Sequence, residues 1–288
     1  MAKAHPVIDL HIHTKISDGT DTPEELLSRV RAAGIEVFAV TDHDAIAACE
    51  RIKALLRPAD PRFLFGVEFS CKDELGKYHI LGYGYDPQAP SIRAVVENGH
   101  KNRLRKLGLR LERLKEDHGI TFPDADVKAL FALPNPGKPH LANLMVRYGY
   151  ADTIRQAFGD VLNRLHVPDL YTRPEVAIRG ILDAGGVPVL AHPCFGDGDQ
   201  LILGDDLKER VRRLMGSGLL GLEGYYSGYT EALREQVLSL ADAFDLYVTA
   251  GSDYHGGNKL IPLADTGLSP DVPLPKGAAR FLSDLLSD

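Results

Sequence analysis

Seven short apolar runs recur along the chain, and most are separated by stretches with the three- to four-residue apolar spacing of a helix. The runs are rich in branched and aromatic side chains, which favour strands. They cover residues 7–13, 37–44, 63–70, 78–85, 187–193, 219–227 and 246–255. The amphipathic stretches cover residues 22–34, 45–56, 174–186, 205–218 and 230–244. This alternation predicts a mostly parallel sheet, either a barrel or a doubly wound sheet.

Local signals define the first helix and one turn. Thr22 is suited to cap the helix, Pro23 to open it, Glu25 to complete a capping box, and Gly34 to end it. The runs on either side of residues 71–77 are separated by only a short turn. We therefore expect a hairpin at this point rather than a helical crossover.

Residues 91–166 interrupt the alternation with an almost wholly helical pattern and no convincing strand. We predict a helical cap there, inserted between a first part of the barrel (residues 1–90) and a second part (residues 167–288). Within residues 101–119, a leucine stripe is expected to lie in the core, and a basic stripe is expected to be a solvated face, with an anion-binding surface as the alternative. The leucines are Leu104, Leu107, Leu111 and Leu114, and the basic residues are Arg103, Lys106, Arg110 and Arg113.

Composition places the chain among ordinary globular proteins. It has 288 residues, 44% of them hydrophobic and 25% charged. It contains no apolar run near the length of a membrane span and no signal-peptide core, and its three cysteines are widely separated. We expect a cytoplasmic protein without disulfides. The net charge of −7 argues against binding to duplex DNA.

Side chains that bind metals stand at the ends of the apolar runs. His11 and His13 are two residues apart, so on a strand they project from the same face. Two half-buried histidines would be an ordinary feature of a strand end, but the later runs repeat the pattern. Histidines and carboxylates occur at the ends or edges of these runs, namely His43, Glu68, His79, His192, Asp253 and His255. Burying so many unpaired groups costs several kcal/mol for each charge, and bound cations would remove that cost.

The motifs "DLHIHTKISDG", "TDHD", "GVEFS", "HILGYG", "AHP" and "GSDYH" resemble, in this order, those of the PHP (polymerase and histidinol phosphatase) family. They run from Asp9 to His255. The cap and the segment "PHLA" resemble a group of stand-alone phosphoesterases. Members of that group remove the 3′-phosphate of nucleoside 3′,5′-bisphosphates or trim short RNAs from the 5′ end. The resemblance implies a distorted α/β barrel of seven strands and seven helices.

The resemblance also implies up to three metal ions at the carboxyl rim of the barrel. The first ion would be held by His11, His13, Glu68 and Asp253. Glu68 would bridge to the second ion, which His79 and His192 complete. The third ion would be held by Asp18, His43 and His255. Manganese is the expected metal, although such mixed sites also accept iron, zinc or cobalt. Asp18 precedes a glycine and has a turn-forming alternative. Because Thr22 already caps the next helix, Asp18 is free to act as a ligand.

The charges favour phosphoester hydrolysis. Three divalent ions, the carboxylates of Asp18, Glu68 and Asp253, and one bridging hydroxide leave a net charge of about +2, which suits a phosphate dianion. Metal coordination lowers the pKa of water towards ~7 and supplies the nucleophile. The expected catalytic residues are Asp18, Glu68, His140, His192 and Asp253. Either His140 or metal-bound water would protonate the leaving group.

Recognition of the substrate is assigned to the cap. Lys138, His140, Arg103 and Arg110 are the candidate phosphate contacts. Relatives often have arginine where this chain has Lys138, and lysine lacks the bidentate fork. Glu223 ends a strand outside the ligand motifs; it would orient a ligand, face the substrate or cap a backbone group. Asp42 and Asp44 are interpreted as orienting residues or turn formers.

The expected substrate is a small phosphate ester or a short RNA, most simply 3′,5′-pAp or a 5′-phosphorylated oligoribonucleotide. Three alternatives remain open from the sequence: a histidinol-phosphate phosphatase with the same metal site, an amidohydrolase that cleaves C–N bonds, and a non-catalytic module serving a polymerase. The sequence carries no signal for the oligomeric state.

Overall fold

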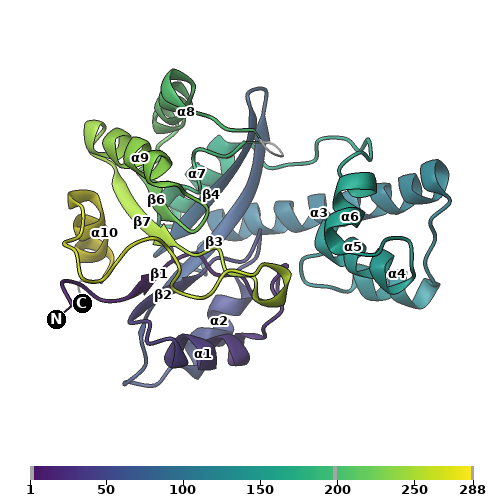
Figure 1. The fold of residues 1–288 in the computed structure, drawn as a ribbon, viewed down its shortest axis with the longest axis horizontal. Helices are drawn as coiled ribbons and strands as arrows, with labels where there is room; N and C mark the ends of the chain where they lie inside the picture. Colours follow the sequence, from purple (N-terminus) through teal and green to yellow (C-terminus); the bar gives the residue numbers. More distant parts are fainter. Residues whose placement is uncertain (1–2, 197–199, 287–288) are drawn as a thin grey trace.

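The computed structural model describes residues 3–196 and 200–286, and its centre is a seven-stranded sheet whose strands lie in chain order. Figure 1 shows this sheet with helices packed around it and a helical lobe to one side. The strands are β1 (Ile8–Asp9), β2 (Val37–Val40), β3 (Arg62–Asp73), β4 (Gly76–Tyr83), β5 (Val187–Leu190), β6 (Gly221–Tyr226) and β7 (Tyr247–Gly251).

The strand directions confirm the predicted barrel and its distortion. Neighbouring strands are parallel except around β4, which runs antiparallel to both β3 and β5. The β3–β4 pair is the hairpin predicted at residues 71–77. Beyond β1, the Leu10 N–H donates to the Ala250 carbonyl at 2.8 Å, and the Asp253 N–H donates to the His11 carbonyl at 2.8 Å. These hydrogen bonds join the first and last strands and nearly close the barrel.

Six helices surround the barrel within the described residues. They are α1 (Pro23–Ala32), α2 (Ala47–Leu55), α7 (Pro174–Asp183), α8 (Gly204–Gly216), α9 (Glu231–Ala243) and α10 (Lys276–Leu286). The predicted capping box of α1 is present, with Thr22 and Glu25 each bonded to the other's backbone N–H. Helix α10 was not predicted from the sequence. Its Phe281 is 1% exposed and packs edge-on against Tyr83, so α10 covers an end of the barrel core.

The cap is built from α3 (Pro90–His118), α4 (Asp124–Phe131), α5 (Lys138–Arg147), α6 (Ile154–Gln156) and a π-helical turn, η1 (Ala157–Leu162). Residues 90–162 contain no strand. Figure 1 shows α3 running from the barrel into this lobe. Ile92 and Val95 at its start belong to the barrel's hydrophobic cluster, whereas Leu107 and Leu114 belong to a separate cluster within the cap. One long helix therefore joins the two parts.

The expectation of a solvated basic stripe on α3 is wrong for three of its four residues. Lys106 and Arg110 are 6% and 7% exposed, and the Arg103 side chain is 14% exposed. Only Arg113 is largely exposed. The first three lie on the helix face that packs towards β3 and Tyr171, so contacts with the rest of the chain cover them.

Two further expectations concern the whole chain. Cys49, Cys71 and Cys194 are free and buried, in agreement with the absence of a disulfide signal. Across the described residues, no helix has the length and apolar character needed to cross a bilayer.

Candidate metal centre

Strand alternation brings the predicted ligands to one end of the barrel interior. Leu64 and Glu68 are four residues apart on β3 and share a face, as do His79 and Leu81 on β4. Leu64 and Leu81 lie in the interior hydrophobic cluster. Glu68 and His79 therefore face the same interior, next to that cluster.

Glu68 lies at the middle of the centre. Its Oε2 is 3.3 Å from His11 Nε2, 3.2 Å from His13 Nε2 and 3.1 Å from His43 Nδ1. Its Oε1 is 2.9 Å from His79 Nδ1 and 3.4 Å from His192 Nε2. The two oxygens thus face two different groups of histidines, which is the geometry of a bridging carboxylate.

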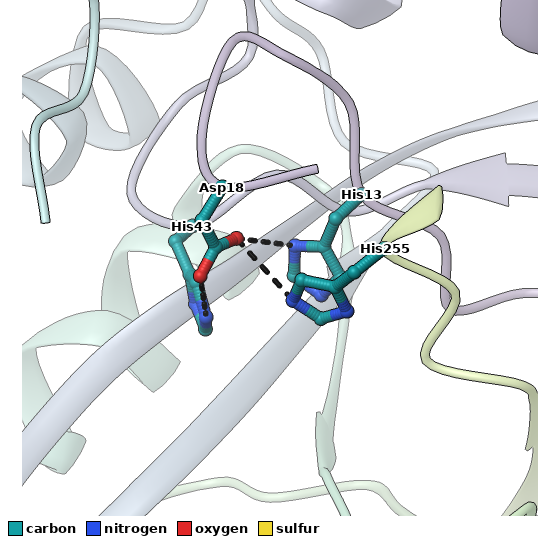
Figure 2. A group of neighbouring side chains, drawn as sticks. All are labelled: His13, Asp18, His43 and His255. Carbon is teal, nitrogen blue, oxygen red and sulfur yellow. Dashed lines mark ion pairs between the residues drawn. The ribbon is translucent and has the colours of Figure 1, made fainter. Parts of the chain in front are cut away.

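Asp18 joins a third group of histidines. Figure 2 shows its carboxylate between His43 and the stacked rings of His13 and His255. The Asp18 oxygens lie 3.3 Å from His255 Nε2, 3.7 Å from His13 Nδ1 and 3.8 Å from His43 Nε2. Its carboxylate thus faces three histidines, as the predicted ligand role requires.

Asp253 completes the cluster. Its Oδ1 lies 3.5 Å from His11 Nε2, 3.3 Å from His13 Nε2 and 3.4 Å from His255 Nδ1. All nine residues predicted as ligands are therefore brought together in one region. Three groups have ligand atoms within 4.8 Å of one another: His11 with His13 and Asp253, His43 with Glu68 and His79, and His13 with Asp18, His43 and His255.

His192 lies outside these three groups but close to His79. The His192 Nε2 and His79 Nδ1 atoms are 3.3 Å apart. Two nitrogens bound at about 2.1 Å to one tetrahedral ion lie about 3.4 Å apart. The pair therefore has the spacing of two ligands that share an ion.

The donor atoms fit divalent cations. His11 Nε2, His13 Nε2, His43 Nδ1, Asp18 Oδ1 and Glu68 Oε1 are all buried and have no hydrogen-bond partner. Buried polar atoms are almost always satisfied. A convergent set of unsatisfied nitrogen and carboxylate donors is what a transition-metal site requires before an ion binds.

Glu223 fixes the orientation of His11. Its Oε1 lies 2.8 Å from His11 Nδ1, and its Oε2 accepts the His192 backbone N–H at 2.8 Å. A carboxylate at Nδ1 keeps the proton there and leaves Nε2 free for a metal. The sequence left three roles open for Glu223, and the structure shows contacts for two of them. Glu223 contacts the His11 ring and also caps the His192 backbone N–H.

Asp42 holds the loop that carries Asp18. It accepts the Thr14 N–H at 2.8 Å, the Thr14 hydroxyl at 2.6 Å and the Ser17 hydroxyl at 2.6 Å. Asp42 is fully buried, and burial raises the pKa of its carboxyl. Three hydrogen bonds from one loop identify it as an orienting residue, as interpreted from the sequence.

Two of the predicted ligands have an unusual backbone conformation. His192 has φ 28° and Asp253 has φ 57°, in the region that non-glycine residues rarely adopt. Such residues cost of order 1–3 kcal/mol each and cluster at functional sites. Gly251 nearby is required for packing, because a Cβ there would lie 2.2 Å from His11 Cβ and 2.6 Å from Glu223 Oε1.

Sequence reasoning missed three residues that support the centre. Asp9 accepts the Ser252 hydroxyl at 2.6 Å and the Ala264 N–H at 2.8 Å, which ties the loops after β7 to β1. Lys259 Nζ lies 2.5 Å from Asp253 Oδ2, and Tyr226 donates to the same oxygen at 3.0 Å. Asp9 was detectable from its spacing two residues before His11, whereas Lys259 lies in a loop without a pattern.

The cap reaches the centre through its candidate substrate contacts. Arg103 donates to Asp44 Oδ2 at 2.6 Å and to Ser70 Oγ at 2.8 Å, and Asn135 donates to the His43 carbonyl. His140 accepts the Gly137 N–H through Nδ1 at 3.1 Å. Burial lowers the pKa of His140, and Asp18 partly opposes this effect. Lys138 turns instead to Asn163 Oδ1, at 2.8 Å.

The charges of the centre are strongly coupled. Burial alone would raise the pKa of Glu68, but His79, His11 and His43 hold it well below its usual range. Burial would lower the pKa of His13, yet the adjacent carboxylates of Asp253 and Glu68 raise it to about 10. Burial lowers the pKa of His43 to about 3. Protons and metal ions therefore compete for these side chains.

Comparisons with known proteins agree with this centre. The PHP domain signature matches residues 9–130. A crystal structure from Bifidobacterium adolescentis, whose assignment as a metal-dependent phosphoesterase is provisional, superposes with a TM-score of 0.83 at 31% identity. It covers 98% of this chain and 96% of its own.

Three relatives match over most of their length. The phosphoribosyl 1,2-cyclic phosphate 1,2-diphosphodiesterase of Eggerthella lenta is 31% identical, over 88% of this chain and 96% of its own. The 3′,5′-nucleoside bisphosphate phosphatase of Chromobacterium violaceum is 30% identical, over 92% of each chain. The 5′-3′ exoribonuclease of Haemophilus influenzae is 29% identical, over 86% of this chain and 89% of its own. This chain belongs to the PHP family and is a metal-dependent phosphoesterase.

Proposed function

We propose that the enzyme hydrolyses the phosphate on the 3′ side of a nucleotide that carries a second, 5′-phosphate. The substrate is a nucleoside 3′,5′-bisphosphate such as pAp, or a short 5′-phosphorylated oligoribonucleotide. The observation that carries the proposal is the Glu68-centred cluster, with the cationic side chain of Arg103 and the imidazole of His140 reaching it from the cap.

We assign three divalent ions to the nine ligands. Glu68 would be shared between an ion held by His11, His13 and Asp253 and an ion held by His79 and His192; Asp18, His43 and His255 would hold the third. The shared position of Glu68 between two groups of histidines supports this division. Manganese is the first choice, because the donor set accepts several transition metals and the family resemblance favours this one. Bound there, such ions supply positive charge to phosphoryl oxygens and lower the pKa of water.

The protein's own side chains have separate tasks in this proposal. The Glu223 carboxylate holds His11 with Nε2 facing the reaction centre. Arg103 is fixed by Asp44 and Ser70 beside the centre, where it would position a phosphate oxygen. His140 lies near Asp18, and its lowered pKa leaves the ring neutral at pH 7. Because Nδ1 accepts the Gly137 N–H, the ring proton is on Nε2, which would donate a hydrogen bond to the substrate; a neutral ring is too weak an acid to protonate the leaving oxygen, so water at the centre would supply that proton.

The substrates named for the relatives share one feature. A nucleoside 3′,5′-bisphosphate, a phosphoribosyl cyclic phosphate and an RNA chain each carry more than one phosphate group. This feature supports a substrate with a second phosphate. It also brings a cyclic phosphodiester into consideration as a second candidate, because the Eggerthella lenta relative matches over nearly its whole length.

A panel assay tests the proposal. The manganese-loaded enzyme is given 3′,5′-pAp, a 5′-phosphorylated tetraribonucleotide, phosphoribosyl 1,2-cyclic phosphate and histidinol phosphate, and its products are quantified. We expect the highest kcat/KM for one of the first two, and loss of activity in Glu68→Gln. A clear preference for histidinol phosphate, or for the cyclic ester, would contradict the assignment of the substrate while leaving the phosphoesterase chemistry intact.

A further inference from the structure

Lys106 and Arg110 are two buried cations that the metal centre does not require. They lie one turn apart on α3 and are 6% and 7% exposed. Arg110 Nε has no hydrogen-bond partner, and Lys106 Nζ lies 3.5 Å above the ring of Tyr171. Within residues 3–196 and 200–286, neither side chain forms an ion pair with a carboxylate. The carboxylate that acts on Lys106 is Asp44, which is already paired with Arg103, so three cations share one anion here.

Two buried cations side by side are unfavourable unless an anion joins them. Burial lowers the pKa of Lys106 to about 7, and the neighbouring Arg103 and Arg110 act in the same direction. Burial also lowers the pKa of Arg110, while Tyr171 opposes this effect. An anion bound between the two side chains would reverse both effects.

The pair lies on a path that starts at the metal centre. Ser70 is opposite His79 in the β3–β4 register, and it accepts a hydrogen bond from Arg103 at 2.8 Å. Arg103, Lys106 and Arg110 follow one another at spacings of three and four residues, so they share a face of α3. Arg103 and Arg110 are about 10 Å apart along the helix axis. The pair therefore lies one to two helix turns from the residue that reaches the centre.

We propose that Lys106 and Arg110 bind the second phosphate of the substrate, the one that is not hydrolysed. The proposal rests on the proposed function, and it identifies the residues that would make the enzyme specific for a substrate with a second phosphate. An arginine fork and an ammonium group offer the donors that a phosphate requires. The half-buried Tyr171 ring covers Lys106 and is the side chain that the phosphate displaces. Arg110 was already among the phosphate contacts expected from the sequence; Lys106 joins it here, while Lys138 donates to Asn163.

The test compares Lys106→Met and Arg110→Met with the wild-type enzyme. The first readout is the ratio of kcat/KM for 3′,5′-pAp to that for 3′-AMP, which lacks the second phosphate. The second readout is the Kd of 5′-AMP, measured by calorimetry. We expect each variant to lower the ratio at least about tenfold and to weaken 5′-AMP binding by a similar factor, as loss of a charge-assisted hydrogen bond implies. Arg113→Met, on the exposed side of the same helix, is the control.

Thermal unfolding separates binding from a structural role. Removing an unpaired buried charge should leave Tm unchanged or raise it, whereas loss of a supporting contact would lower it. If Arg110→Met does not fold, Arg110→Lys is used instead, because lysine keeps the positive charge but lacks the two-pronged guanidinium. The proposal requires that Arg110→Lys also lower the ratio of the two kcat/KM values. Variants that keep both the wild-type ratio and 5′-AMP affinity would overturn this proposal alone. A wild-type enzyme inactive on every member of the panel would instead overturn the proposed function.

Discussion

Glu68 and Glu223 are both fully buried carboxylates, and their partners give them different roles. The oxygens of Glu68 face ring nitrogens of five histidines, and its Oε1 has no hydrogen-bond partner. Both oxygens of Glu223 are already used, by His11 Nδ1 and by the His192 N–H. Glu68 is therefore free to bridge ions, whereas Glu223 acts through the histidine that it orients.

Glu223→Gln tests this positioning role. The amide keeps the size of the side chain but no longer holds the His11 proton with a charge. We expect metal content and kcat to fall, with a loss of about 10–100-fold in metal affinity or activity and little change in fold. Elemental analysis and steady-state kinetics check this, with the exposed Glu235→Gln on α9 as control. Wild-type metal content and kcat in Glu223→Gln would contradict the role.

Asp18→Asn tests the third group of ligands. Asparagine can preserve the turn before Gly19 but removes the negative charge between the histidines. We expect the circular dichroism spectrum to stay unchanged, metal content to fall by one ion per chain, and turnover to drop roughly 10–100-fold or more. A variant that keeps its metal and its turnover would show that Asp18 serves only the loop.

Lys106 gives a prediction about stability and pH. Its pKa is near 7 in the fold and near 10.5 when unfolded, so the folded chain binds fewer protons between these values. Stability therefore rises with pH across this window, and the cost of the buried charge is greatest below pH 7. Lys106→Met removes that cost. Its Tm should exceed that of wild type more at pH 6 than at pH 9, by about 2–4 °C per kcal/mol. If Lys106→Met and wild type differ in Tm by the same amount at both pH values, the buried charge of Lys106 is not the cause.

At the scale of single elements, β7 and the segment after β1 hold the centre together by close packing. His11 lies against Gly251, and its other side is bound to Glu223 from β6. Side chains of this size fit only because residue 251 has no Cβ. The geometry of the first ligand therefore depends on a glycine in a neighbouring strand.

Gly251→Ala should disturb both stability and metal binding. The added methyl would overlap His11 and Glu223, and overpacking of this kind costs typically 1–3 kcal/mol. We expect a lower Tm together with reduced metal content, measured by calorimetry and elemental analysis. Gly216→Ala, where nothing lies within 4 Å of the new Cβ, is the matched control and should leave both unchanged. If Gly251→Ala behaves like this control, the close packing is not what positions His11.

The elements also show what the sequence can and cannot predict. Strand alternation and position at strand ends were sufficient for Glu68 and His79, because a strand's period fixes which face a side chain occupies. The helix period of α3 likewise identified the residues that share a face. The helix period does not indicate whether other parts of the chain pack over that face, so the burial of Lys106 and Arg110 was not predicted. Lys259 was missed because loop contacts have no period.

At the scale of the whole molecule, the cap and barrel meet over the metal centre. Arg103 of the cap helix pairs with Asp44 next to the ligand His43, and Asn135 donates to the His43 carbonyl. The same helix begins in the barrel core at Ile92 and Val95 and continues into the cap core. The barrel thus carries the nine predicted ligands, and the cap lies beside them.

The central claim is that nine side chains around Glu68 hold three metal ions for phosphoester hydrolysis. Its most direct test is elemental analysis of the wild-type protein purified without chelators and reconstituted with manganese. The ligand geometry predicts close to three ions per chain. A value of one ion per chain, at full phosphoesterase activity, would contradict the trinuclear centre.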